Sequence, residues 1–155
     1  MTTLILYATK HGAAREIARR IASHIDGAVM HDLKQPDVPD PAGFDCVIIG
    51  SSLYAGSIRK EAKAFLSQNA DGLRDKKVGL FLSGMSQGEA RAAFDRNFPA
   101  DMLQSAAVIS FLGGIFDPKE AGMAERLIMK AAAKHVEYTN TISDEKIQQF
   151  AESMK

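Results

Sequence analysis

Residues 3–25 read TLILYATKHGAAREIARRIASHI, and this stretch predicts a strand, a turn and a helix in that order. Thr3–Ala8 is a short apolar run without alternation, which is typical of a strand buried on both faces of a parallel sheet. Lys10–Gly12 predicts a turn. Ala13–Ile25 predicts a helix, because isoleucines recur every fourth position along one stripe. The chain therefore opens on the first half of a strand–helix–strand unit.

The same alternation continues to the end of the chain. Four further apolar runs predict strands, and helical patterns separate them, except after the second strand, where three prolines predict an irregular crossover. Such alternation predicts an α/β fold with an open parallel sheet of five strands, right-handed crossovers and helices on both faces. The later strands are expected at Ala28–Leu33, Phe44–Gly50, Lys77–Ser83 and Ala106–Leu112, and the later helices at Ser57–Asn69, 87–105 with a break at Phe98-Pro99, and Ser143–Met154 with Ser143 as N-cap.

Composition indicates one globular domain over residues 1–155. Hydrophobic residues make up 46% and charged residues 25%, which excludes a disordered or fibrous chain. Nineteen Lys and Arg balance nineteen Asp and Glu, so no net charge favours a nucleic-acid partner. The single cysteine, Cys46, has no disulfide partner and is expected to be a small core residue. The four dispersed histidines match no metal-site spacing, so no metal is predicted.

The N-terminus predicts a cytoplasmic protein. Met1-Thr2-Thr3 leads directly into the first strand without the basic segment of a signal peptide. All apolar runs are far shorter than the roughly 20 residues that span a bilayer. We therefore expect a soluble or peripheral protein.

A segment of about thirty residues, 113–142, exceeds what a minimal five-strand sheet needs. Its helical pattern over 120–135 carries basic residues on one stripe and apolar residues on a neighbouring one. Such a helix either packs on the sheet with its charged face in water, or lies on an anionic membrane. A peripheral membrane contact through 120–135 is the second of these alternatives.

Three loops are the candidate ligand site. In open parallel sheets, ligands bind beyond the carboxyl ends of the strands, where the strand order reverses. The loops at that edge are Thr9–Ala14, Ser51–Gly56 and Ser83–Gly88, and all three are rich in small residues that let a ligand approach the backbone.

The first loop leads into a helix N-terminus, where free N–H groups and the helix dipole favour an anion such as phosphate. It is either such a phosphate cradle or an ordinary strand–helix turn, and His11 either donates to the anion or faces solvent. In the second loop, Tyr54 either stacks on a planar ligand or packs against the next helix. The third loop offers hydroxyls, amides and Met85 as the lining of a planar ligand.

Two segments resemble the flavodoxin-like FMN proteins: LILYATKHG at 4–12 and VIIGSSLYAG at 47–56. More narrowly, the chain is similar to the flavodoxin-type, menaquinone-dependent protoporphyrinogen oxidases of heme biosynthesis. The narrower resemblance rests on Thr9, Gly12, REIA at 15–18, Tyr54, Gly56, and LIMK at 127–130 followed by Tyr138-Thr139.

The resemblance implies a flavodoxin-like sheet of order 2-1-3-4-5 and an FMN cofactor. It implies that the FMN phosphate lies in the first loop and the isoalloxazine ring between the second and third loops. The implied phosphate groups are Thr9, Gly12 and the backbone of Lys10, His11, Ala13 and Ala14, and the implied ring contacts are Ser52, Leu53, Tyr54, Ala55, Gly56, Ser83, Gly84 and Met85.

The chain departs from the family pattern at two positions near the phosphate. Ala8 and Ala14 stand where the family usually has hydroxyl residues, which removes hydrogen bonds worth about 0.5–1.5 kcal/mol each. The chain also has no Trp, so only Tyr54 is placed to stack on the ring.

Three functions remain open on this resemblance. The first is an FMN-dependent oxidoreductase that passes electrons from a reduced small-molecule substrate to a quinone or other acceptor. The second is a flavodoxin that carries electrons between redox partner proteins, and the third is a flavin-free scaffold for a protein partner. No side chain stands out as a general acid or base, so no catalytic residue is predicted. A phosphoacceptor receiver domain is excluded, because the strand ends lack its acidic residues.

Overall fold

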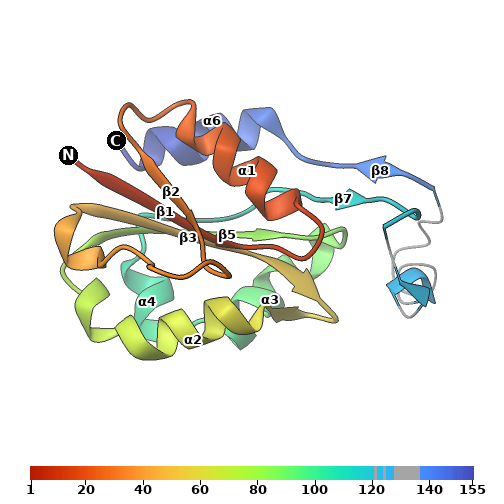
Figure 1. Ribbon diagram of the computed structural model, residues 1–155, viewed down its shortest axis with the longest axis horizontal. Helices are drawn as coiled ribbons and strands as arrows, with labels where there is room; N and C mark the ends of the chain where they lie inside the picture. The colour runs from red at the N-terminus through yellow and green to blue at the C-terminus, as the bar shows by residue number, and fades with distance from the viewer. Residues whose placement is uncertain (121, 124, 128–136) are drawn as a thin grey trace.

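The computed structural model describes residues 1–120, 122–123, 125–127 and 137–155. A parallel sheet lies between two layers of helices (Figure 1). The parallel strands follow the predicted order 2-1-3-4-5, with the loop ends of β1 and β3 at the reversal of strand order. In space they are β2 (Val29–Asp32), β1 (Thr3–Ala8), β3 (Cys46–Tyr54), β5 (Lys77–Ser83) and β6 (Val108–Phe111).

Helices cover both faces of the sheet, as predicted (Figure 1). Phe98 is extended between two of them, because the residue before a proline is pushed out of the helical region. This breaks the helical stretch at Phe98-Pro99, as the sequence predicts. One face carries α1 (Ala13–Ala22) and α6 (Asp144–Ser153); the other carries α2 (Lys60–Asn69), α3 (Ala90–Asn97) and α4 (Ala100–Ser105); the short 3-10 helices are η1 (Pro41–Gly43), η2 (Asp71–Leu73) and η3 (Gln87–Glu89).

Each face of the sheet has its own apolar core. The core under α1 and α6 contains Phe81 and Phe150, whose rings meet edge to face at 6.1 Å between centroids. The core under α2, α3 and α4 contains Phe65 and Phe94. Cys46 is fully buried in the first core, as predicted for a small core residue.

The second loop is a β-hairpin, which corrects the sequence-based boundaries. β3 continues to Tyr54, and β4 (Ser57–Ile58) returns antiparallel to it, so the helix expected from Ser57 begins only at Lys60. Tyr54 pairs with Ser57, and the two residues between them have positive φ, 50° at Ala55 and 81° at Gly56. This is the geometry of a type I′ turn, which matches the twist of the two strands.

The segment after β6 forms a small sheet of its own. β7 (Ile115–Phe116) pairs antiparallel with β8 (Thr139–Asn140) and projects beyond the carboxyl ends of the parallel strands (Figure 1). In the expected helix over 120–135, residues 123 and 125–127 are helical. The expected basic stripe consists of Arg126, Lys130 and Lys134, of which only Arg126 lies within the described residues. Among the described residues, no helix is long and apolar enough to cross a membrane.

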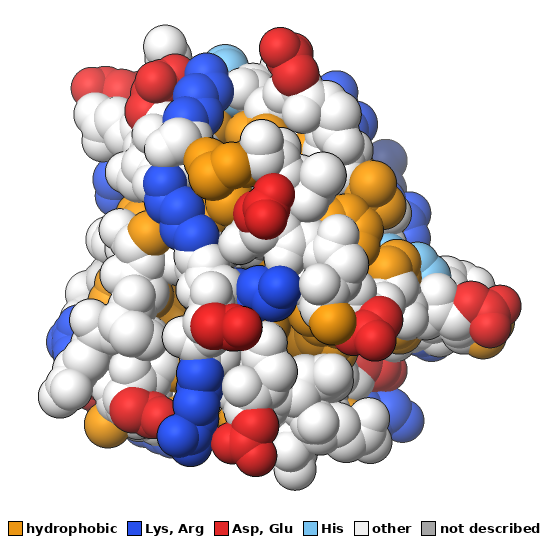
Figure 2. All heavy atoms as spheres, turned by 90° about the vertical axis from the view of Figure 1, so that its left-hand side faces the viewer, with side chains coloured by type: hydrophobic (Ala, Val, Ile, Leu, Met, Phe, Trp, Pro, Cys, Tyr) orange, Lys and Arg blue, Asp and Glu red, His pale blue; other side chains and the backbone are white. Residues whose placement is uncertain are grey.

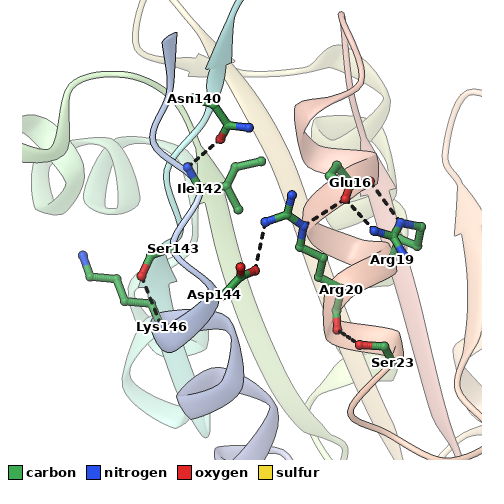
Figure 3. A network of polar contacts seen from close by, with 9 residues as sticks. All are labelled: Glu16, Arg19, Arg20, Ser23, Asn140, Ile142, Ser143, Asp144 and Lys146. Atoms are coloured by element: carbon green, nitrogen blue, oxygen red, sulfur yellow. Dashed lines mark hydrogen bonds and ion pairs between the residues drawn. The ribbon is translucent and has the colours of Figure 1, made fainter.

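A polar network joins the two helices on one face of the sheet (Figure 3). Arg19 and Arg20 both donate to Glu16 on α1, and Arg20 also donates to Asp144 of α6 at 2.9 Å. Ser143 accepts a hydrogen bond from the Lys146 amide, which confirms it as the N-cap of α6. α1 itself ends at Ala22, one turn before the predicted Ile25.

Figure 2 shows the side of the molecule opposite the β7–β8 sheet. Lys and Arg side chains alternate there with Asp and Glu side chains. The chain as a whole has nineteen basic and nineteen acidic residues, and on this face too the two signs of charge are mixed. A strongly one-signed face would steer charged partners, and this side does not have that character.

Candidate functional site

The first loop presents free backbone N–H groups at the N-terminus of α1. Gly12 is the N-cap of α1 with φ of 99°, a backbone conformation that glycine adopts without strain. Its amide donates to the Thr9 hydroxyl at 2.9 Å, which closes the loop on itself. The amides of Ala13 and Ala14 open the helix, and within the described part of the chain neither donates a hydrogen bond. These free N–H groups lie at the positive end of the α1 dipole.

Basic side chains surround this loop, and two expected hydroxyl side chains are absent. Ala8 and Ala14 are 2% and 0% exposed and belong to the two cores. Lys10, His11 and Arg15 line the loop instead. An anion held here would therefore be bound by backbone amides and nearby positive charge rather than by extra hydroxyls.

A partly open cavity joins all three predicted loops. It has a volume of about 140 Å³. Its walls include ten of the predicted residues: Lys10, His11, Ala13, Ser52, Leu53, Tyr54, Ala55, Ser83, Gly84 and Met85. Thr9 and Gly12 line an adjoining hollow of about 560 Å³ that shares Lys10 and His11, whereas Ala14 and Gly56 line neither space.

The Ser52 hydroxyl is an unsatisfied buried group in the cavity wall. Its neighbour Ser51 accepts a hydrogen bond from the Arg59 amide and donates to the Ser52 carbonyl. The Ser52 Oγ atom is buried and has no hydrogen-bond partner among the described residues. A buried hydroxyl without a partner costs about 1–3 kcal/mol, and a polar ligand in the cavity would satisfy it.

Tyr54 faces the first loop across the cavity. The Lys10 ammonium lies 4.4 Å from the centroid of the Tyr54 ring, a cation–π distance. The residue is half-buried at the end of β3 and is held by the hairpin rather than by a flexible turn. One face of the ring therefore contacts a cation of the first loop.

Asn97 anchors the hairpin from α3. Its side-chain amide donates to the Gly56 carbonyl at 2.9 Å, and its oxygen accepts from the Ile58 amide at 3.2 Å. These bonds hold both sides of the turn that carries Tyr54 and Ala55. The sequence does not reveal this role, because Asn97 lies about forty residues after the turn.

The segment after β6 forms the remaining cavity wall. A side chain at Gly114 would place its Cβ 2.7 Å from the Gly84 carbonyl oxygen, so the two backbones touch. The Gly84 amide also donates to Gly113 at 3.1 Å. The sequence did not point to six residues of this wall: Gly114, Ile115, Phe116, Asp117, Glu120 and Glu125. The only sign of them in the sequence was the unusual length of the segment 113–142, which contains all six.

Glu125 pairs with two basic residues of the first loop, Lys10 and His11. Its carboxylate contacts the Lys10 ammonium, and it lies 2.7 Å from His11 Nε2. The side chain is 15% exposed. Burial by itself raises the pKa of Glu125. The hydrogen bonds from Lys10 and His11 together outweigh burial, so the pKa of Glu125 lies below its usual value.

The sheet order, the helix-capped loop and the cavity at the switch point together match one family. A family model described as a flavodoxin domain matches residues 4–143. The chain belongs to the flavodoxin domain family.

Solved flavodoxins share the fold of this flavodoxin-domain chain. A Streptococcus pneumoniae TIGR4 flavodoxin has a TM-score of 0.64 and 21% identity over 99% of this chain and 97% of its own. A short-chain flavodoxin associated with a non-canonical PDU bacterial microcompartment has 0.63 and 18% over 99% and 96%. A Fusobacterium nucleatum flavodoxin bound to flavin mononucleotide has 0.53 and 18% over 70% and 68%. The search of curated proteins found no match.

Proposed function

We propose that this flavodoxin-domain protein binds FMN in the cavity and transfers electrons through it. The observation that carries the proposal is the meeting of all three predicted loops around one cavity at the carboxyl ends of β1, β3 and β5. This is the place where open α/β sheets bind their ligands. When bound, FMN supplies reversible redox chemistry, and the protein supplies binding and orientation.

The residues present fit the two ends of FMN. The free amide of Ala13 at the N-terminus of α1, with Lys10 and His11 beside it, suits a phosphate. The apolar cavity wall at Leu53 suits the ring system. The unpartnered Ser52 hydroxyl suits a polar edge of that ring, because it lacks a partner in the described protein.

The more specific proposal is an enzyme similar to the flavodoxin-type protoporphyrinogen oxidases, which passes electrons from a reduced substrate to a quinone. The β7–β8 segment supports it, since Ile115 and Phe116 add an apolar wall against which a second ring system can lie. The zero net charge also suits an enzyme for small molecules. A cytoplasmic location and a membrane contact through 120–135 belong to this proposal.

An electron carrier between proteins is the second candidate. It is favoured by the comparison with the Streptococcus pneumoniae and short-chain flavodoxins. The structural match covers nearly the whole of this chain and nearly the whole of each of those two chains. On this proposal the chain takes up FMN but exchanges electrons with a protein partner. It does not turn over porphyrinogen with a quinone.

The first experiment is a visible spectrum of the purified protein, followed by titration of the flavin-free form with FMN. Flavin bands, or a Kd in the micromolar range or tighter, support the FMN proposal. Quinone-coupled oxidation of porphyrinogen then separates the enzyme from the carrier, for which only electron exchange with a reductase is expected. Failure to bind FMN even at high concentration contradicts the proposal and leaves the flavin-free scaffold.

A further inference from the structure

Glu125 is bound to the side chains that an anionic ligand of the first loop would contact. Its two carboxylate oxygens contact different residues, Oε1 the Lys10 ammonium and Oε2 the His11 ring. Both residues line the cavity and the adjoining hollow next to Thr9 and Gly12. The carboxylate is thus already bound to the two basic side chains of the loop that border both spaces.

Lys10 of this pair also contacts Tyr54, another residue of the cavity wall. Lys10 bridges from Glu125 to the face of Tyr54, and all three residues line the cavity. The remaining volume of about 140 Å³ is well below the roughly 300–1,000 Å³ of typical ligand pockets. A flavin ring can therefore enter only if side chains of the cavity wall move.

We propose that Glu125 is an internal anion that competes with the phosphate of FMN for Lys10 and His11 and so sets the affinity of the site. Binding of FMN then exchanges one anion for another at the same two side chains. The proposal rests on the proposed FMN function. It predicts the direction of the change in FMN affinity: removing the Glu125 carboxylate strengthens FMN binding instead of weakening it.

Glu120 provides a matched control. It lines the same cavity and the same hollow, but no ion pair joins it to a cation among the described residues. Glu120→Gln therefore removes one negative charge from the site without releasing Lys10 or His11. Any general effect of charge on FMN binding appears equally in Glu120→Gln and Glu125→Gln.

The test is a titration of the flavin-free full chain with FMN and with riboflavin, followed by quenching of flavin fluorescence. We expect Glu125→Gln to bind FMN at least about tenfold more tightly than the unaltered chain. Riboflavin lacks the phosphate, so its affinity should change less than about twofold. Glu120→Gln should change FMN affinity by less than about threefold.

Equal FMN affinity in the unaltered chain and Glu125→Gln would overturn the inference while leaving the FMN function standing. Equal strengthening by Glu120→Gln, or equal strengthening for riboflavin, would also overturn it. If FMN binds to no variant, the proposed function fails, and inorganic phosphate decides the inference. Thermal stabilisation by phosphate should then be larger in Glu125→Gln than in the unaltered chain, and equal or absent stabilisation overturns the competition.

Discussion

The ring of Phe81 occupies the space that a side chain at Gly50 would need. A Cβ at Gly50 would lie 1.9 Å from the Phe81 ring, and the ring is itself fixed against Phe150 on the other side. β3 and β5 are neighbours, with Gly50 and Phe81 directly paired in register. A large residue on one strand is thus accommodated by the absence of a side chain on the next.

Gly50→Ala should therefore destabilise the fold. Relief of the contact requires the Phe81 ring to move within a close-packed core, which costs about 3 kcal/mol of unfolding free energy. Gly72→Ala is the control, because nothing lies within 4 Å of a Cβ there, and it should change stability by less than about 0.5 kcal/mol. Urea denaturation measures both, and equal stability of the two variants would contradict this packing.

Gly12→Ala should weaken FMN binding beyond its effect on stability. Gly12 and Gly27 both have positive φ, 99° and 72°, with nothing within 4 Å of a Cβ. Each substitution to Ala should cost about 1–2 kcal/mol of stability from backbone strain. Only Gly12 shapes the first loop, so only Gly12→Ala should lower FMN affinity, by about tenfold. Matched titrations decide it, and equal affinities would remove the first loop from the site.

Asn97→Ala should loosen the hairpin and the site together. The change removes bonds to the Gly56 carbonyl and the Ile58 amide, and it leaves a half-buried amide without its partner. We expect a loss of about 2 kcal/mol in unfolding free energy. FMN affinity should also fall several-fold, because the same turn carries Tyr54.

Asn69→Ala is the matched control for the hairpin. Asn69 donates one hydrogen bond to Phe65 within α2, at 2.9 Å, and lines neither the cavity nor the adjoining hollow. It should lose about 1 kcal/mol of stability and leave FMN affinity unchanged. An Asn97→Ala variant that binds FMN as well as Asn69→Ala would show that the hairpin does not position the ligand.

Glu16 should contribute to acid stability. Hydrogen bonds from Arg19, and then from Arg20, lower the pKa of Glu16 from 4.5 to about 2. A lowered carboxyl pKa stabilises the fold above the unfolded value of 4.5, and that contribution is lost as the pH falls toward 2. Glu16→Gln should be less stable than the unaltered chain near neutral pH, and the difference should shrink below pH 4.5.

Thermal denaturation across this pH range tests the role of Glu16. Glu145→Gln is the control, since Glu145 is exposed on α6 and makes no ion pair within the described residues. Its stability curve should follow that of the unaltered chain. A Glu16→Gln curve that runs parallel at every pH would mean that the pairs with Arg19 and Arg20 do not stabilise the fold.

Much of the fold could be predicted from the chain alone. The strands Thr3–Ala8 and Lys77–Ser83 have the predicted bounds, because buried parallel strands are unbroken apolar runs. The errors lie at element ends. Ser57 was expected to begin a helix, and only its pairing with Tyr54 makes it a strand residue. That pairing depends on positive φ at Ala55, which no local preference of alanine predicts.

The candidate site divides in the same way. The sequence by itself determined the three small-residue loops and their meeting at one edge, because parallel strands align their carboxyl ends. Only the tertiary structure brought Glu125 to Lys10 and His11, which precede it by more than a hundred residues. Local patterns record which face of an element is apolar, but a contact between two distant polar side chains leaves no periodic signal. The residues of the three loops can thus be found from local sequence patterns. The contact of Glu125 with Lys10 and His11 exists only in the folded chain.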